Sequence, residues 1–522
     1  MTLMRRTAFI LLAISAALLL SGCEGFFDLP MGAPVNAPTG QTDNSLDGQG
    51  PTAEDSQERT VAAEEFLSLR AEPDTTAAVL RKLDRGTVVL VKDRAGSFSF
   101  VEVKETGETG YVLSSYLRVS EAKDPPTGTA PSGFNAIGME VEASDWVAIC
   151  EKYLTLREKP SLAAKALGRI NPNETVRVYG FNGLFARVSD KAGRKGYVLS
   201  GYLTPAKPDK HLSGLDVVKP ADEYSYTRMM KDLNELARLH PDRLRLKSAG
   251  KSAQGRDIPV AVLGDPKAAH HVLVQGAVHG REHMTALLLM AQLEYCLKFG
   301  GESAGVSTVS QSLRNVCLHI LPMANPDGVT ISQTAEMNGT LNKIYQQDMN
   351  RNLTDLPPGD YLRQWKANAA GVDINRNFPN GWQQLDAAGG PSYARWKGNA
   401  PADQPETQAL IGYTRSRDFS ATVSYHAYGS CIYWEFGEKE AVNGKSRTLA
   451  EAIAACTGYP LASSEGLDGG GYKDWVMDEL GIPSVTVEVG TRECPLPLVE
   501  FSAIWARNRN ALAAVARWVA ES

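Results

Sequence analysis

The sequence predicts an α/β domain, built on a mixed, largely parallel sheet flanked by helices, which follows two small all-β barrels. The 522 residues exceed what one compact domain usually holds. Residues 59–120 and 141–204 contain short alternating apolar runs separated by Gly, Pro, Asn and Asp, as in small antiparallel barrels. Over residues 222–522, helix-period segments alternate with β-branched runs, which is typical of helices that connect parallel strands.

The first residues have the pattern of an export signal. Arg5 and Arg6 precede the apolar run TAFILLAISAALLL, which is short for a membrane-spanning helix. The tetrad LSGC that ends at Cys23 resembles the bacterial lipobox. We therefore expect a lipoprotein signal peptide over residues 1–22, lipidation of Cys23, and a lipid-anchored protein on the periplasmic or outer-membrane side of the cell envelope. Ordinary cleavage that leaves Cys23 unmodified is the alternative.

Three segments poor in large apolar residues separate the predicted domains. Residues 23–58, 121–140 and 205–221 are rich in Gly, Pro, Asp and other small or polar residues, so they can bury little surface. We expect the first to be a flexible tether and the other two to be linkers.

The overall charge excludes one class of partner. The net charge is −6 and no block rich in Lys and Arg occurs, so we expect no binding to nucleic acid. The chain has seven cysteines. Disulfides are possible in an exported protein, but the sequence pairs none of them and is equally compatible with reduced core cysteines.

The two barrel segments are repeats of one another. The first contains FLSLRAEP and ends with GYVLSSYL, and the second contains YLTLREKP and ends with GYVLSGYL. These paired motifs resemble bacterial SH3 domains, a family often attached to enzymes that act on cell walls. The resemblance implies association with peptidoglycan. For the tyrosines of the motifs, Tyr111, Tyr116, Tyr197 and Tyr202, a purely structural role as core aromatics is the alternative.

A strand-to-helix junction carries the first chemically notable residues. In VLVQGAVHGREHMTALLLMAQLEY (residues 272–295), a β-branched run gives way to a helix-period run, and HGRE lies between them. His279 and Glu282 would lie at this junction. Alone, such a pair predicts little, because a surface salt bridge would produce the same pattern.

Two further polar residues follow β-branched runs in the same domain. His426 ends the run in ATVSYHAYG, and Glu488 ends the run in IPSVTVEVG. The carboxyl ends of parallel strands gather at one edge of an α/β sheet, where ligands bind. We therefore expect His279, Glu282, His426 and Glu488 to lie together.

This set of residue types suits a catalytic zinc ion. Two imidazoles and one carboxylate leave the fourth tetrahedral position of Zn²⁺ open for water. A second carboxylate can then accept the proton of that water. Because Glu282 shares a turn with His279, it is the better candidate for the third ligand, and Glu488 remains as the general base.

Six motifs occur in the order found in the zinc metallocarboxypeptidase family of carboxypeptidase A, which the domain resembles over essentially its whole length. The resemblance implies a carboxypeptidase-like fold and one zinc ion held by His279, Glu282 and His426, with Glu488 as general base. The motifs are HGRE (279–282), NPDGV (325–329), GVDINRNF (371–378), the strand-end His426, GGYKDW (470–475) and Glu488.

The same resemblance implies a binding site for substrate. Asn375 and Arg376 would clamp a substrate carboxylate, a role that a planar guanidinium performs through bidentate hydrogen bonds. Arg281 would assist in substrate binding. Lys473 occupies the position where the resembling carboxypeptidases place the residue at the base of their side-chain pocket, and a lysine there would favour a substrate side chain that carries a carboxylate.

Two departures separate this chain from the digestive members. LRQWKANAAGVDINRNF lacks the arginine that stabilises the oxyanion in those members, and Arg363, Lys366 and Asn368 remain as candidate donors. Gly466 occupies the position at which those members carry a tyrosine, so a phenolic donor from that position is absent. Together with the stretches RQWKANA, GGYKDW and ECPLPLVEFSAIWARN, these departures bring the chain closer to the branch of γ-D-glutamyl-diaminopimelate peptidases.

The function expected from the sequence is therefore zinc-dependent cleavage of the γ-D-glutamyl bond to meso-diaminopimelate in peptidoglycan stem peptides. Lys473 would then meet one carboxylate of diaminopimelate and Arg376 the other, with Glu465 or Asp468 near its amine. A generic metallocarboxypeptidase that removes C-terminal residues is one alternative. A catalytically inactive wall-binding lipoprotein is another.

Overall fold

The computed structural model describes most of the chain from residue 57 onward. The predicted signal peptide, Cys23, the linker 121–140, Tyr116 and the acids Glu465 and Asp468 lie outside the described residues. Within them, no helix combines the length and apolar character needed to cross a membrane, and the described cysteines form no disulfide bond. The described residues are 57–61, 66–72, 77–84, 87–95, 98–113, 117–119, 145–148, 154–162, 164–206, 209–221, 223–462 and 470–522.

The first barrel is a seven-stranded antiparallel sheet in the order β3-β2-β6-β5-β4-β1-β7. Side chains alternate between its two faces, so that Leu67 and Leu69 of β2 pack with Val101 and Val103 of β5 in the core. The strands are β1 (Gln57–Val61), β2 (Phe66–Arg70), β3 (Val79–Asp84), β4 (Val88–Ala95), β5 (Phe98–Val103), β6 (Thr109–Leu113) and β7 (Leu117–Val119).

The second barrel has the same topology as the first. Its order, β10-β9-β13-β12-β11-β8-β14, matches the first strand for strand, and β11 carries a bulge between Val178 and Gly180 where β4 carries one between Val91 and Asp93. Two barrels of one topology are what the repeated motifs predict. The strands are β8 (Asp145–Ala148), β9 (Leu154–Arg157), β10 (Ala166–Ile170), β11 (Thr175–Asn182), β12 (Phe185–Ser189), β13 (Lys195–Leu199) and β14 (Leu203–Pro205).

The C-terminal domain contains an eight-stranded sheet in the order β15-β16-β18-β17-β19-β22-β20-β21. Its four central strands, β18, β17, β19 and β22, are parallel, and antiparallel strands extend the sheet on both sides. The mixed, largely parallel sheet is therefore confirmed. The strands are β15 (Leu244–Lys251), β16 (Asp257–Leu263), β17 (His270–Gln275), β18 (Val316–Leu321), β19 (Ala421–Ala427), β20 (Cys431–Tyr433), β21 (Leu461–Ala462) and β22 (Ser484–Val489).

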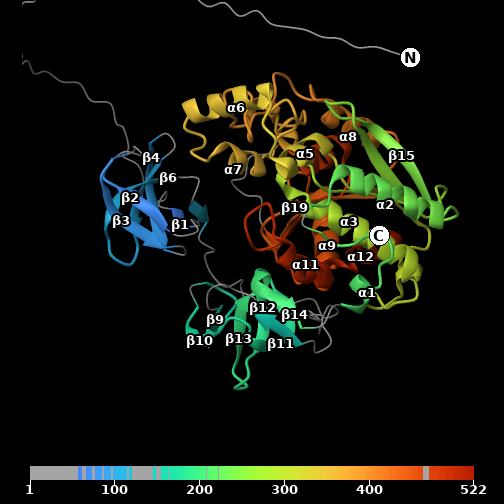
Figure 1. The fold of residues 1–522 in the computed structure, drawn as a ribbon, viewed down its shortest axis with the longest axis horizontal. Coiled ribbons are helices and arrows are strands. Elements are labelled where there is room, and N and C mark those ends of the chain that lie inside the picture. The colour runs from blue at the N-terminus through green and yellow to red at the C-terminus, as the bar shows by residue number, and fades with distance from the viewer. Residues whose placement is uncertain are drawn as a thin grey trace, which may run out of the picture. The chain divides into compact units, whose positions relative to one another are not determined.

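Helices cover both faces of this sheet, which buries its central strands on each side (Figure 1). One face packs against α2 (Tyr226–Leu239), α3 (Met284–Lys298), α9 (Glu440–Thr457), α11 (Phe501–Asn508) and α12 (Ala511–Glu521). The other packs against α8 (Pro405–Arg415) and α10 (Tyr472–Trp475). The remaining helices are α1 (Lys210–Ser213), α4 (Val309–Ser312), α5 (Pro326–Thr334), α6 (Gly339–Asn350) and α7 (Pro358–Arg363).

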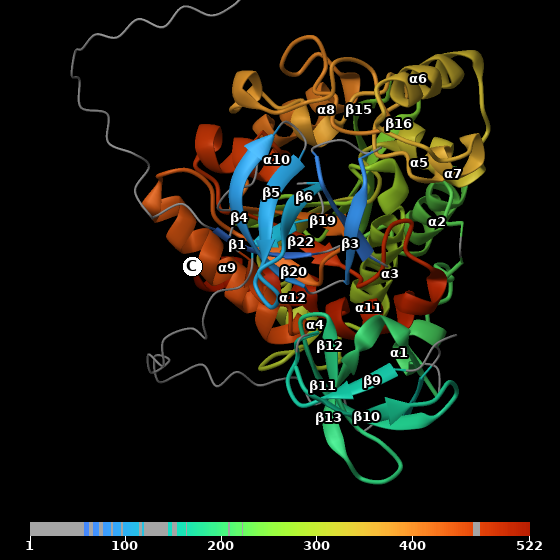
Figure 2. The same ribbon diagram turned by 90° about the vertical axis from the view of Figure 1, so that its left-hand side faces the viewer.

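The second barrel and the C-terminal domain form one compact unit, residues 122–522, whereas the first barrel belongs to a separate unit. The core of the second barrel includes Ala503 and Ala506 of α11, and both ribbon views show the barrel beside this helix (Figures 1 and 2). The segment that follows the barrel is tied to the same region, because Asp209 accepts hydrogen bonds from the Trp505 indole of α11 and from the guanidinium of Arg509, the residue after this helix.

Candidate metal centre

His279 lies in a tight turn between β17 and α3. It precedes a short 3₁₀ helix, η3 (Gly280–Glu282), which leads into α3. Gly280 allows the backbones of Gly328 and Trp365 to approach closely, because a Cβ at residue 280 would lie 2.8 Å from the carbonyl oxygen of Trp365 and closer still to that of Gly328. The turn therefore depends on glycine next to His279.

Asn325, in the NPDGV motif, holds this turn in place. Its side-chain amide donates to the carbonyl oxygens of Val278 at 3.1 Å and Ala367 at 3.0 Å. Its backbone N–H donates to Ala277 O at 3.0 Å. One buried side chain thus joins the segment that carries His279 to the segment that follows Lys366.

The structure brings His279, Glu282 and His426 together in a buried cluster. Nδ1 of His279 lies 2.7 Å from Glu282 Oε1, and Nδ1 of His426 lies 2.9 Å from Glu282 Oε2. The two Nδ1 atoms are 3.2 Å apart. All three side chains therefore direct ligand atoms toward one point.

The hydrogen bonding of this cluster fits a metal cation. His279 Nε2 lies 3.1 Å from Asp373 Oδ1, so Nε2 carries the proton and Nδ1 keeps its lone pair. Although burial opposes it, the His279 and His426 imidazoles hold the pKa of Glu282 well below its usual range, so this carboxyl is ionised. A cation at this point would be bound by both Nδ1 atoms and by Glu282, and this donor set suits Zn²⁺.

Asp373 is a residue of this site that the sequence patterns do not single out. Burial works to raise its pKa, but His279 and then the charges of Lys366 and Arg376 hold the pKa of Asp373 below its usual value. A carboxylate on the far nitrogen of a ligand imidazole fixes the tautomer and the ring orientation. The available signal was its place beside Asn375 and Arg376 in GVDINRNF.

Glu488 lies next to the cluster, on the strand beside that of His426. The two residues are register partners in the parallel pair of β19 and β22. Glu488 Oε2 is buried and has no hydrogen-bond partner. Burial raises the pKa of Glu488 to about 7, against the opposing charge of His426. A carboxylate with one unpartnered oxygen and this pKa is suited to accept a proton near neutral pH.

The predicted substrate-binding residues lie on two segments around the cluster. Arg281, in η3, donates to Gln364 Oε1 at 2.8 Å. Asn375 and Arg376 belong to another 3₁₀ helix, η4 (Ile374–Arg376), and Arg376 donates to Asp386 O at 2.6 Å.

Lys473 is buried, with 7% of its surface exposed, so it does not extend into solvent. Its ammonium donates to Glu435 O at 2.7 Å and to the Asp474 carboxylate. The backbone N–H of the preceding residue, Tyr472, donates to Asn375 Oδ1 at 3.0 Å. This contact joins the segment of Lys473 to that of Asn375 and Arg376.

The three candidate oxyanion donors differ in their surroundings. Arg363 is exposed. The Asn368 amide is committed to structure, because it donates to Gln404 Oε1 and Glu406 Oε2, each at 2.9 Å. The positive charge of Lys366 favours the ionised forms of Asp373 and Glu488, where it opposes the effect of burial on both pKa values. Lys366 is therefore the best placed of the three.

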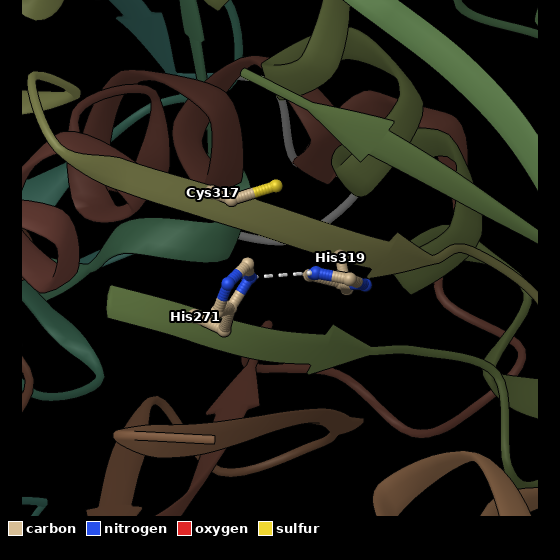
Figure 3. Close-up of side chains that lie close together, drawn as sticks. All are labelled: His271, Cys317 and His319. Atoms are coloured by element: carbon tan, nitrogen blue, oxygen red, sulfur yellow. Dashed lines mark hydrogen bonds between the residues drawn. The ribbon is translucent and has the colours of Figure 1, made fainter. Parts of the chain in front are cut away.

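A second group of potential metal ligands lies elsewhere in the sheet, where His271 of β17 faces Cys317 and His319 of β18 (Figure 3). Arg417 donates to His271 Nε2, so His271 Nδ1 carries the proton and donates to His319 Nε2 at 3.1 Å. His319 Nδ1 then donates to Tyr413 Oη at 2.7 Å. Every imidazole nitrogen is matched by a donor or an acceptor, so this group needs no cation.

Two imidazoles and a carboxylate that could hold zinc, beside a carboxylate with one unpartnered oxygen, define the site of a zinc-dependent hydrolase. The family model described as zinc carboxypeptidase matches residues 229–511. The chain belongs to this family and is a zinc metallopeptidase that uses one zinc ion. The bacterial SH3 domain model matches residues 65–118 and 152–204, which are the two barrels.

The chain is also similar to individual proteins. The gamma-D-glutamyl-L-diamino acid endopeptidase 1 of Lysinibacillus sphaericus is 31% identical over 297 residues, which cover 55% of this chain and 71% of that protein. The uncharacterized protein YqgT of Bacillus subtilis (strain 168) is 26% identical over 288 residues, which cover 54% of this chain and 74% of YqgT. A solved carboxypeptidase A structure from Helicoverpa armigera is 19% identical, with coverage of 65% and 92% and a TM-score of 0.45.

Proposed function

We propose that this peptidase hydrolyses peptidoglycan stem peptides at the bond between γ-D-glutamate and meso-diaminopimelate. The observation that carries the proposal is the contact between Asn375 and Tyr472, which links the segments of two cationic side chains, Arg376 and Lys473. Diaminopimelate has two carboxylates, one for each cation. The name of the relative from Lysinibacillus sphaericus, a γ-D-glutamyl-diamino acid endopeptidase, supports the same bond.

We assign the metal to His279, Glu282 and His426, because their ligand atoms converge and Asp373 fixes the His279 ring. What zinc supplies to this set is Lewis acidity, which lowers the pKa of water and polarises a carbonyl group. Glu488 accepts the proton of the attacking water and delivers it to the leaving amine.

The remaining roles concern charge on the substrate. Lys366, whose charge already acts on Glu488, stabilises the negative charge that develops on the carbonyl oxygen. Asn375 and Arg376 hold a carboxylate of the substrate, and Arg281 orients the peptide. Lys473 donates a hydrogen bond to the second carboxylate, and its contact with Asp474 is weakened when it does so.

The direct test uses the soluble protein without residues 1–23. Purified muropeptides are incubated with it and the products are identified by mass spectrometry. Release of diaminopimelate-containing fragments cut after γ-D-glutamate is the expected result. Removal of C-terminal residues from ordinary L-peptides, with muropeptides left intact, would instead identify a generic metallocarboxypeptidase.

We also propose that the protein is a lipid-anchored component of the cell envelope, attached to a membrane through Cys23. The tetrad at residues 20–23 supports this location. Metabolic labelling with a radioactive fatty acid should label the wild-type protein and leave Cys23→Ala unlabelled. Equal labelling of both proteins would contradict an anchor at this cysteine.

The SH3 resemblance supports association of the first barrel with peptidoglycan. Deleting residues 59–120 should reduce sedimentation of the protein with insoluble cell wall. Activity on small soluble muropeptides should stay unchanged, because the first barrel is a unit apart from the peptidase. Unchanged sedimentation would contradict wall binding by this barrel.

A further inference from the structure

The second barrel contacts the loop that immediately follows the strand of Glu488. This loop, residues 490–500, connects β22 to α11 and is called the 490–500 loop below. The Arg492 guanidinium donates to Gly201 O at 3.0 Å and lies 4.1 Å from the centre of the Tyr202 ring. Two adjacent residues of the barrel thus bind one side chain of the loop.

A buried carboxylate ties the loop together at the same place. Glu500 accepts hydrogen bonds from the Thr491 N–H at 2.8 Å, the Thr491 hydroxyl at 3.0 Å and the Arg492 N–H at 3.1 Å. Gly201 packs directly onto this network. A Cβ at residue 201 would overlap Thr491 Oγ1 and lie 2.7 Å from Glu500 Oε2. The barrel can dock here only with a glycine at this position.

Other residues of the loop contact the segment that follows His426. Gly490 O accepts hydrogen bonds from the Gly429 N–H at 3.2 Å and the Ser430 hydroxyl at 3.0 Å, shortly after His426 in the chain. Cys494 is buried, and the negative charges of Glu282 and Glu488 add to the effect of burial in raising the pKa of its thiol. The loop therefore contacts both the barrel and the segment that follows the proposed ligand His426.

A second anchor holds the barrel against the C-terminal domain. The buried guanidinium of Arg507, on α11, donates to Gly183 O at 2.6 Å and to Thr457 O at 2.7 Å. It also lies 5.0 Å from the centre of the Phe181 ring. The Gly183 N–H donates to Gly458 O at 3.0 Å. Contacts at both ends of α11 thus fix the orientation of the barrel.

The first barrel does not carry the residues that make these contacts. In the repeated motif, Ser115 of GYVLSSYL stands where GYVLSGYL has Gly201. By the shared strand register, Arg94 corresponds to Phe181. Serine has the Cβ that Thr491 excludes, and an arginine would meet the charge of Arg507. The two copies therefore differ where the second copy docks.

We propose that the second barrel is a fixed part of the peptidase that positions Glu488 by bracing the 490–500 loop through Gly201 and Tyr202. This inference rests on the proposed role of Glu488 as the general base. Gly201, Tyr202 and Arg492 are positioning residues that act through the loop. The second copy thus serves the catalytic unit, and wall binding falls to the first copy.

The mechanism is the exclusion of loop conformations in which the proton acceptor is displaced. Thr491 is three residues from Glu488, with only Val489 and Gly490 between them. A displacement of about 1 Å at a reacting group can cost about a hundredfold in rate. Release of the loop should therefore lower kcat, whereas KM should change little because the clamp at Arg376 lies on another segment.

The test transfers the residue of the first copy into the second. Full-length Gly201→Ser should lower kcat on a diaminopimelate tripeptide about ten- to hundredfold, with zinc content unchanged. Hydrogen exchange at the Thr491 and Arg492 amides should become faster, because their acceptor is displaced. Ser115→Gly, the reverse change in the first copy, is the matched control and should match the wild type in all three measurements.

A second pair of variants separates the ring contact from general destabilisation. Tyr202→Phe keeps a ring under Arg492 and should behave as wild type, whereas Tyr202→Ala should reproduce the loss of kcat and the faster exchange. Wild-type kcat and exchange in Gly201→Ser and Tyr202→Ala would overturn the inference, as would loss of zinc in place of loss of kcat. An inactive wild type would contradict the proposed substrate, and the exchange rates would still decide on the brace.

Discussion

Asp373 Oδ1 lies 3.1 Å from His279 Nε2, on the side of the imidazole that faces away from Glu282 and His426. The carboxylate fixes both the tautomer and the plane of the ring, so His279 Nδ1 is directed toward Glu282 and His426, where we propose that the metal binds. The second oxygen of Asp373 accepts the Arg395 N–H at 3.2 Å. The His279 ring is therefore oriented by Asp373, whose own position is fixed by the backbone of Arg395.

Asp373→Asn should weaken zinc binding without abolishing it. Loss of such a partner typically costs about 10- to 100-fold in metal affinity. Competition with a chelator of known affinity, followed by zinc analysis, measures the change. Wild-type affinity in Asp373→Asn would show that the contact does not orient the ring.

His279→Ala and His426→Ala should each lower the zinc content of the purified protein well below one ion per chain. Cys317→Ser is the matched control, because Cys317 belongs to the other histidine-containing group and should keep full zinc. Full occupancy in either alanine variant, or loss of zinc in Cys317→Ser, would show that the ligand assignment is wrong.

Glu488→Gln should keep zinc and lose most turnover. The substitution removes a proton acceptor without removing a ligand, and a general base typically contributes about 10²- to 10⁴-fold in rate. Zinc content and kcat are measured on the same preparation. Near-normal turnover in a zinc-replete variant would mean that another residue is the base.

The activity should depend on the ionisation of Glu488. Because burial raises its pKa to about 7, the ionised form that accepts a proton decreases as the pH falls below that value. We expect kcat/KM to fall about tenfold for each pH unit below about 7. Zinc content measured at each pH controls for loss of the metal. A profile that stays flat down to about pH 5.5 would contradict this pKa.

Lys473 should favour diaminopimelate over lysine in otherwise identical tripeptides. A charge-assisted hydrogen bond contributes about 1.5–3 kcal/mol, which corresponds to roughly a ten- to hundredfold preference in kcat/KM. Because Asp474 shares the Lys473 ammonium, we expect the lower end of that range. Lys473→Gln should remove the preference. Equal kcat/KM values for both tripeptides in the wild type would exclude this role.

The positions of the site residues were best predicted where those residues follow a β-branched run, because such a run marks the end of a strand. His279, His426 and Glu488 follow β-branched runs, and the parallel sheet brings their strand ends to one edge, as the patterns predict. Asp373 lies in a segment without regular periodicity. Its position could not follow from strand order, because it depends on how the region after α7 folds over the sheet.

The docking of the second barrel could not be predicted for a different reason. Alternation along a strand reports which side chains enter the core of a barrel, but not which turn residues meet another domain. Gly201 and Phe181 have the residue types of ordinary turn and strand-end positions. Lys473 was likewise not predictable as buried, because the carbonyl of Glu435 that accepts a hydrogen bond from its ammonium is distant in sequence.

The burial that raises the pKa of Glu488 to about 7 has a consequence for stability. A carboxylate is disfavoured where it is buried, so above this pKa the ionised Glu488 makes the folded state less stable than it would be with an apolar side chain there. The reaction centre is therefore a point of local instability that the surrounding core, with Trp365 and Trp475 fully buried, has to offset. Selection for activity opposes selection for stability at this residue, so variants chosen only for thermal resistance should tend to replace Glu488 and become inactive.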